Sequence, residues 1–137
     1  MAQQIDEIIK EEADGTLSFG NHLLPEKAKA EDFKHGGDLY KVKTFVTMTK
    51  LEKNGLFLYE SVPGTSVKQF VEDEKGVSFK VESDQDAQIT VGMEEDTEYS
   101  VLVGGKSMGI MKSNPSGKIN LSVELADAGE VEVIIKK

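Results

Sequence analysis

The sequence predicts an all-β protein, an antiparallel two-sheet β-sandwich of about eight to ten strands with a jelly-roll-like or immunoglobulin-like topology. Two observations carry this prediction. Over residues 98–137 apolar and polar side chains alternate with a period of two, so that Ile119, Leu121, Val123 and Leu125 share one face. Turn-forming residues also divide the chain at short intervals. The 137 residues suit a single β-sandwich domain over residues 1–137.

The N-terminal segment fits two structures. Ile5, Ile8 and Ile9 have the spacing of one helix face, but Asp14-Gly15 follows closely and is typical of a hairpin turn. We therefore expect a strand here, with a short amphipathic helix as the alternative.

Residues 25–34 also leave two structures open. Pro25 suits the first position of a short helix. The same residues fit an edge strand in which Ala28 and Ala30 point inward, while the lysines point outward and oppose pairing with another chain. Gly36-Gly37 ends the element in either case.

The middle of the chain shows the clearest turn chemistry. Residues 39–48 are rich in β-branched and aromatic side chains and predict a strand. Asn54-Gly55 predicts a two-residue hairpin, because both turn positions need a positive φ. Residues 56–59 are all apolar and predict a central strand, and Pro63-Gly64 predicts a type II turn.

The same alternation between turns predicts the remaining strands. They are expected at residues 67–71, 77–81, 87–91, 98–103, 107–111, 118–125 and 131–135. Gly104-Gly105 predicts a hairpin turn rather than a phosphate loop, because a phosphate loop needs an earlier glycine at a fixed spacing.

The composition argues against several classes of partner. The net charge is −9, and all 16 cationic residues are lysine. An acidic chain without arginine is repelled by nucleic acid and by anionic membranes, and it lacks the guanidinium fork that grips phosphate. Without cysteine there is no disulfide and no thiolate ligand. No signal peptide or membrane-spanning run is apparent, so the expected location is cytoplasmic by default.

Acidic turns provide the candidate metal ligands. Asp84 and Asp86 lie in one predicted loop, and Glu94, Glu95 and Asp96 lie in the next. Calcium binds oxygen ligands from loops of this kind, although the Asp-x-Asp-x-Asp-Gly spacing is missing and acidic turns also serve solubility. No cofactor is expected unless calcium binds here.

Two histidines give a weaker metal hypothesis. His22 and His35 lie in the segment that has no clear secondary structure, beside Asp32 and Asp38. Their spacing matches no helical metal motif, and exposed histidines are the simpler interpretation.

Aromatic side chains provide a candidate ligand-binding surface. Tyr40, Tyr59 and Tyr99, with the phenylalanines, would form a sugar-stacking platform if they shared an exposed sheet face. Most of them alternate with charged residues, as core residues do, so burial in the core is the competing interpretation.

Three segments carry a resemblance to known sequences. Residues 12–20, 40–45 and 49–65 resemble a group of short, uncharacterised bacterial β-sandwich proteins, some of which carry an automated endosialidase-like label. Sialidases as a family grip the sialate carboxylate with several arginines, and this chain contains none. The chain is also too short for a sialidase propeller. The resemblance therefore does not imply sialidase activity.

The residues favour a non-catalytic binding or assembly module, with carbohydrate as the most concrete ligand and a glycan or protein as the partner. One alternative is a structural subunit of a homo-oligomer. Another is a small hydrolase that uses paired carboxylates or a metal, although no nucleophile elbow is present. The polar face of residues 118–125 carries only lysine, serine, asparagine and glutamate, and the apolar face offers no chemistry, so a site is expected in the loops or on the opposite sheet.

Overall fold

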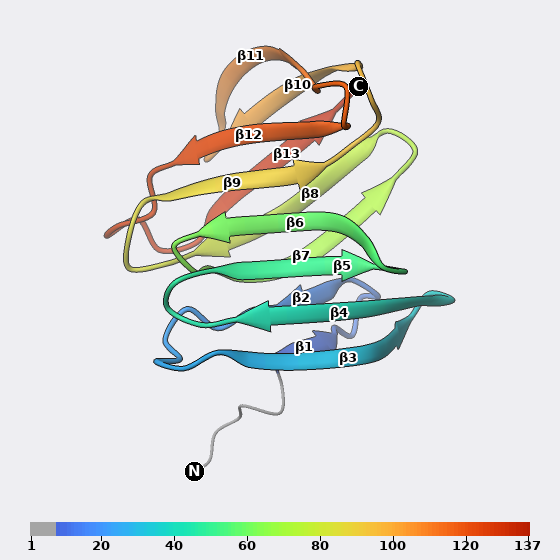
Figure 1. Cartoon of the computed structure of the whole chain (residues 1–137). Coiled ribbons are helices and arrows are strands. Elements are labelled where there is room, and N and C mark those ends of the chain that lie inside the picture. The colour runs from blue at the N-terminus through green and yellow to red at the C-terminus, as the bar shows by residue number, and fades with distance from the viewer. Residues whose placement is uncertain (1–7) are drawn as a thin grey trace.

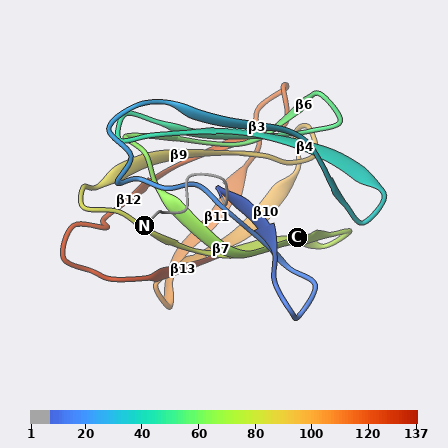
Figure 2. The same ribbon diagram turned by 90° about the horizontal axis from the view of Figure 1, so that it is seen from below.

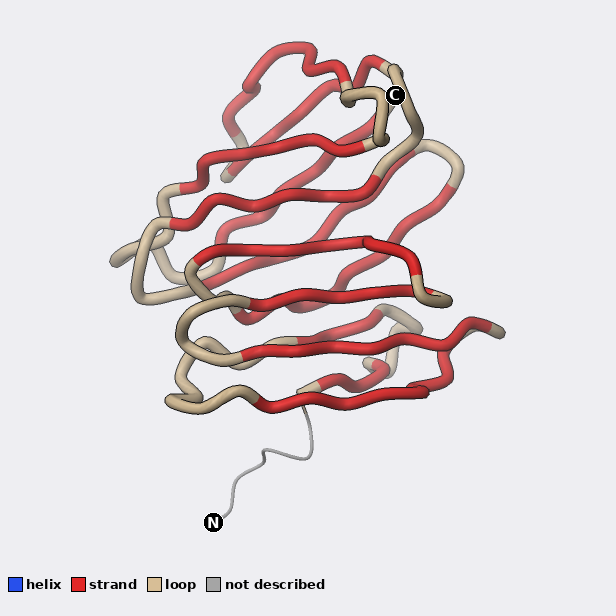
Figure 3. The backbone as a smooth tube through the Cα atoms, in the orientation of Figure 1, coloured by secondary structure: helices blue, strands red, loops and turns tan. Residues whose placement is uncertain are grey.

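The computed structural model describes residues 8–137. This range holds thirteen strands and no helix (Figure 3). The strands form two antiparallel sheets that face each other as two layers and do not close into a barrel (Figures 1 and 2). The predicted two-sheet β-sandwich is thus confirmed, with more strands than the eight to ten expected.

One sheet has seven strands and the other has six. In spatial order the seven-stranded sheet contains β1 (Ile9–Glu11), β2 (Leu17–Phe19), β7 (Ser66–Asp73), β8 (Gly76–Glu82), β13 (Val131–Lys136), β10 (Glu98–Val103) and β11 (Lys106–Lys112). The six-stranded sheet contains β12 (Lys118–Val123), β9 (Ala87–Gly92), β6 (Leu56–Val62), β5 (Thr49–Lys53), β4 (Asp38–Thr44) and β3 (Ala28–His35).

Strand direction divides the loops between two ends of the sandwich. At the first end lie the β5–β6 and β7–β8 hairpins, the β9–β10 loop and the β11–β12 loop. At the second end lie the β4–β5, β6–β7, β8–β9 and β12–β13 connections. The two ends therefore present different groups of side chains.

The core lies between the two sheets and follows the alternation in the sequence. Ile119, Leu121, Val123 and Leu125 are all buried, as their spacing predicts. Tyr59 occupies the centre, with its ring 5.2 Å from that of Phe19 and 5.5 Å from that of Phe79, both in edge-to-face geometry. Removal of these apolar side chains from water is the main force that holds the two layers together.

Residues 25–34 form no helix, so that alternative is wrong. They enter β3, an edge strand that pairs with β4 from Ala28 opposite Thr44 to His35 opposite Asp38. Ala28 and Ala30 pack against the core, as the edge-strand alternative predicts. A helix would leave the edge of β4 unpaired, whereas the strand satisfies its backbone groups.

The turn predictions succeed at the hairpins and fail once. Asn54 (φ 52°) and Gly55 (φ 80°) form the predicted β5–β6 turn, and Gly104-Gly105 joins β10 to β11. Gly64 has no positive φ, so the predicted type II turn at Pro63-Gly64 is wrong. Close packing against the backbone of Phe45 explains the glycine instead.

The N-terminal prediction is settled only in part. Ile8 and Ile9 are buried, and β1 pairs with β2 across the Asp14-Gly15 turn, which supports the strand. Ile5 lies outside the described residues. The described part of the chain also contains no helix that is long and apolar enough to cross a membrane.

Candidate functional site

A groove of about 670 Å³ lies at the first end of the sandwich. Its walls come from the β5–β6 hairpin, the β7–β8 hairpin, the β9–β10 loop and the start of β12. These segments are far apart in the sequence, and the antiparallel topology brings them to one end. Loop-built clefts of this kind are the usual ligand sites on rigid β scaffolds.

Phe57 is the aromatic side chain that the groove leaves partly exposed. A register shift between β5 and β6 places it opposite Glu52, so that Leu58 and Tyr59 both turn into the core. Lys118 lies over the ring, with its Nζ 4.5 Å from the ring centroid. The lysine fixes one face of the ring by a cation–π contact.

The β7–β8 turn forms the acidic side of the groove. The Asp73 carboxylate accepts hydrogen bonds from the backbone N–H of Lys75 (2.8 Å) and of Gly76 (3.1 Å). Such Asx geometry makes the turn rigid before any ligand arrives. Glu72 and Glu74, on either side of Asp73, are exposed to the groove.

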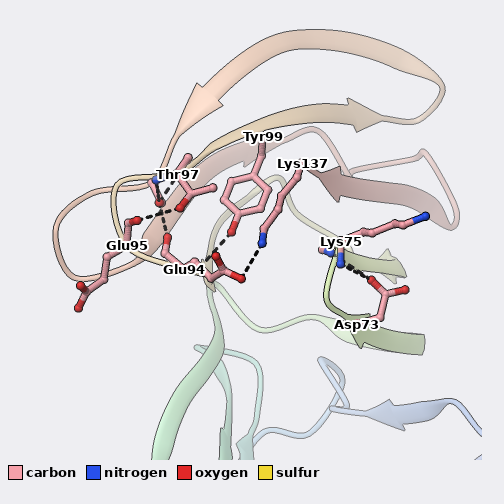
Figure 4. A network of polar contacts seen from close by, with 9 residues as sticks. Asp73, Lys75, Glu94, Glu95, Thr97, Tyr99 and Lys137 are labelled. Atoms are coloured by element: carbon pink, nitrogen blue, oxygen red, sulfur yellow. Dashed lines mark hydrogen bonds and ion pairs between the residues drawn. The ribbon is translucent and has the colours of Figure 1, made fainter.

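The β9–β10 loop forms the opposite side and is fixed by buried groups (Figure 4). The backbone N–H of Glu94 donates to the Tyr99 hydroxyl at 3.1 Å. The Ser113 hydroxyl donates to the Glu94 carbonyl oxygen, and the Thr97 N–H donates to Ser113 Oγ at 2.9 Å. The Glu94 carboxylate pairs with Lys137 at 2.8 Å. The loop is therefore held at its base while its acidic side chains reach solvent.

Negative charge dominates the groove. Its lining includes two lysines and five carboxylates, which are Glu72, Asp73, Glu74, Glu94 and Glu95. Lys53 is already held by Glu72 at 2.8 Å, and this hydrogen bond raises the pKa of the Lys53 ammonium. The electrostatic balance disfavours an anionic ligand and leaves neutral or cationic ones.

The structure separates the predicted metal ligands. Asp84 and Asp86 precede β9 at the second end, whereas Glu94, Glu95 and Asp96 follow β9 at the first end. Asp86 accepts hydrogen bonds from the N–H groups of Leu125 (2.9 Å) and Ala126 (3.0 Å), which gives it a structural role. Residues 8–137 hold no group of three or more potential ligands placed to bind a metal ion.

The two histidines also lie apart and contact different segments. The ring of His22 contacts Ser66 Oγ at 2.7 Å and has Asp84 at 3.8 Å. His35 contacts the Glu11 carboxylate at 2.8 Å and packs against Tyr40. The His35–Glu11 contact joins the edge strands β3 and β1 of the two sheets, whereas His22 joins the β2–β3 loop to β7, so the histidines build no shared site.

The three candidate tyrosines point into the core. Tyr40, Tyr59 and Tyr99 expose 7%, 0% and 1% of their surface. They therefore present no face on which a sugar could stack. Tyr99 contributes to the groove indirectly, because its hydroxyl positions the β9–β10 loop.

Burial of Tyr59 predicts a specific sensitivity to alkali. Removal from water raises the pKa of its phenol above the ordinary value of 10.0. The unfolded chain then loses this proton at a lower pH than the folded chain, so the stabilisation is complete below pH 10 or so and is lost as the pH rises further. Above about pH 10, we expect the unfolding free energy of the wild type to fall more steeply with pH than that of Tyr59→Phe, by up to about 1.4 kcal/mol per pH unit.

Urea unfolding of both proteins across the alkaline range measures this difference in slope. Phe79→Leu serves as the control, because the Phe79 ring packs against that of Tyr59 at 5.5 Å but carries no titratable group, so its pH profile should run parallel to that of the wild type. Parallel pH profiles for wild type and Tyr59→Phe would contradict the prediction.

Sequence reasoning missed Phe57, Lys118 and the β7–β8 acidic turn as members of one site. Phe57 lies within an apolar run that suggests a buried strand, and the bulge that exposes it leaves no signal in the alternation. Of the proposed residues, Glu94, Glu95 and Tyr99 do line the groove.

No family model, curated protein or solved structure matches the chain. The resemblance to short bacterial proteins therefore stays a prediction.

Proposed function

We propose that the chain is a non-catalytic binding module that holds an uncharged glycan in the groove at the first end of the sandwich. The observation that carries the proposal is the combination of a preformed groove with a partly exposed aromatic ring and many hydrogen-bond acceptors. A pyranose ring places its C–H groups on an aromatic face and its hydroxyls on carboxylates or amides. Phe57 offers the ring, and the two acidic loops offer the acceptors.

The charge of the groove selects among glycans. Uronic and sialic acids carry a carboxylate that five nearby carboxylates repel. Hydroxyl groups of a neutral sugar donate to the same oxygens without an electrostatic penalty. Neutral glycans are therefore the ligand class that the groove fits.

The exposure of the carboxylates favours binding over hydrolysis. A glycosidase needs one carboxyl group held protonated, which burial in an apolar pocket achieves. The carboxylates that line this groove are exposed and lie at the end of β7, in the β7–β8 turn and in the β9–β10 loop. The lining of the groove thus offers hydrogen-bond acceptors to sugar hydroxyls rather than the apolar pocket that such an acid requires.

A glycan array followed by calorimetry tests the proposal. We expect at least one neutral oligosaccharide to bind and Phe57→Ala to weaken it about tenfold, since loss of an aromatic contact costs about 1.4 kcal/mol. Phe33→Ala is the matched control, because Phe33 is also half-buried but lies on β3, outside the groove. Selective binding of acidic glycans, or an equal loss in both variants, would count against it.

A further inference from the structure

The outer faces of the two sheets differ in character. On the six-stranded sheet one cross-strand row is polar from edge to edge and consists of Lys29, Lys43, Lys50, Glu60, Thr90 and Asn120. On the seven-stranded sheet the corresponding central row, here called the apolar row, consists of Ser107, Leu102, Ile134, Ser78 and Val71. It runs across five strands and carries no charge.

The apolar row is open to solvent. Leu102 and Val71 expose 37% and 44% of their surface, and Ile134 is half-buried. Ile110 on the edge strand β11, paired with Ser100, extends the apolar surface with an exposure of 63%. An exposed, uncharged row in which one serine separates Leu102 and Ile134 from Val71, on an otherwise charged protein, is typical of an interaction site.

We propose that this face binds the same face of a second copy of the chain, so that two sandwiches stack through their seven-stranded sheets. Stacked sheets meet at about 10 Å with their strands roughly aligned. A two-fold axis along the apolar row places Ile134 over Ile134 and Leu102 over Leu102 of the second copy. Such an isologous contact closes at two copies and leaves no unpaired surface of the same kind.

Charge complementarity identifies the second copy as the occupant. The rows on either side of the apolar row carry Lys136 and Glu132, two positions away from Ile134 in opposite directions along β13. The two-fold axis exchanges these rows, so Lys136 of each copy faces Glu132 of the other. Both side chains are exposed, and neither makes an ion pair within residues 8–137. The same operation places Asp73 opposite Lys68 on β7.

The net charge of the molecule agrees with this choice of face. Two copies of a chain with charge −9 repel each other at most approaches. The two rows that flank the apolar row instead carry Lys68, Lys80 and Lys136 against Glu132 and Asp73. The two flanking rows thus carry three lysines and two carboxylates, and Lys68 already pairs with Glu130 at 2.9 Å, so self-association on this face meets less repulsion than the net charge of the molecule implies.

Light scattering and sedimentation across a dilution from about 200 μM to about 2 μM chain test the proposal. We expect a mass of twice the 15.0 kDa chain for the wild type and of a single chain for Ile134→Lys. Leu23→Lys, at an exposed loop position away from the sheet, should leave the dimer intact. A wild type that stays monomeric, or a dimer that Ile134→Lys does not weaken, overturns the proposal.

A charge exchange tests the two-fold arrangement without touching the apolar row. Glu132→Lys alone should raise the dissociation constant about tenfold or more, because two lysines then face each other. The double variant Glu132→Lys/Lys136→Glu restores opposite charges and should recover wild-type affinity. Failure of the double variant to recover affinity, with its melting temperature unchanged, would reject this geometry. Glycan binding in the groove is a separate readout, so the two proposals fail independently.

Discussion

Thr65→Val is expected to lower the free energy of unfolding by roughly 2 to 3 kcal/mol, although it preserves side-chain volume. Thr65 lies at the centre of a buried hydroxyl network at the second end of the sandwich. Its Oγ1 is 2.8 Å from both the Tyr59 hydroxyl and Ser61 Oγ. Valine removes this shared partner while Tyr59 and Ser61 stay out of reach of water. The cost is the desolvation of hydroxyls left without their hydrogen bonds.

A double-mutant cycle separates this cost from a packing effect. Tyr59→Phe removes one of the stranded hydroxyls, so the double variant should be more stable than the sum of the single losses implies. Thr90→Val is the matched control, because the Thr90 hydroxyl bonds to Asn120 on the outer face of the six-stranded sheet at 2.7 Å. Its effect should stay within about 0.5 kcal/mol. Equal losses for Thr65→Val and Thr90→Val in chemical denaturation would disprove the role of the network.

The hydroxyl network also shows which contacts the sequence pattern does not predict. Alternation over residues 39–48 places Tyr40, Val42, Thr44 and Val46 on one face. The first three are buried, as predicted, whereas Val46 lies beyond the end of β4 and is exposed. It cannot show that Thr44 meets Thr49 at 2.8 Å or that Thr49 bonds to the backbone of Thr65. Those contacts depend on how the β4–β5 and β6–β7 loops converge, which local patterns do not encode.

Local turn chemistry predicts hairpins well because the required φ values belong to the turn residues themselves. Asn54-Gly55 is the clear case. Pro63-Gly64 fails because a long-range contact decides the conformation there. Residues 25–34 are ambiguous for a related reason: a short run with Pro25 and alternating alanines suits a helix or an edge strand. Only pairing with β4 selects the strand.

The candidate site was less predictable than the fold. The groove draws on four segments that span residues 53–118, and its shape depends on the register of both sheets. Acidic loops before and after β9 look equivalent in sequence, yet an extended strand separates them and removes the predicted metal site. The candidate groove lies among the loops, which is one of the two places where the sequence predicts a site, the other being the opposite sheet.

Gly64→Ala is expected to destabilise the fold by about 3 kcal/mol or more, the range for overpacking against rigid groups. A Cβ at this position would lie 1.9 Å from the carbonyl oxygen of Phe45. The Gly64 N–H also donates to the Val46 carbonyl at 3.0 Å, so the two loops cannot separate without losing a hydrogen bond. Because the obstacle is backbone, no side-chain rotation relieves it.

Gly36→Ala is the matched control for this variant. Gly36 has a φ of 60°, and an added Cβ there meets nothing within 4 Å. Alanine at that position should cost about 1 kcal/mol through backbone strain alone. The difference between the two variants in thermal and urea unfolding isolates the steric term. Equal stability of Gly64→Ala and Gly36→Ala would contradict the prediction. It would mean that the β4–β5 and β6–β7 loops move apart easily despite the hydrogen bonds between them. Such a result would also weaken the case that Thr65, the next residue, holds its hydroxyl partners in fixed positions.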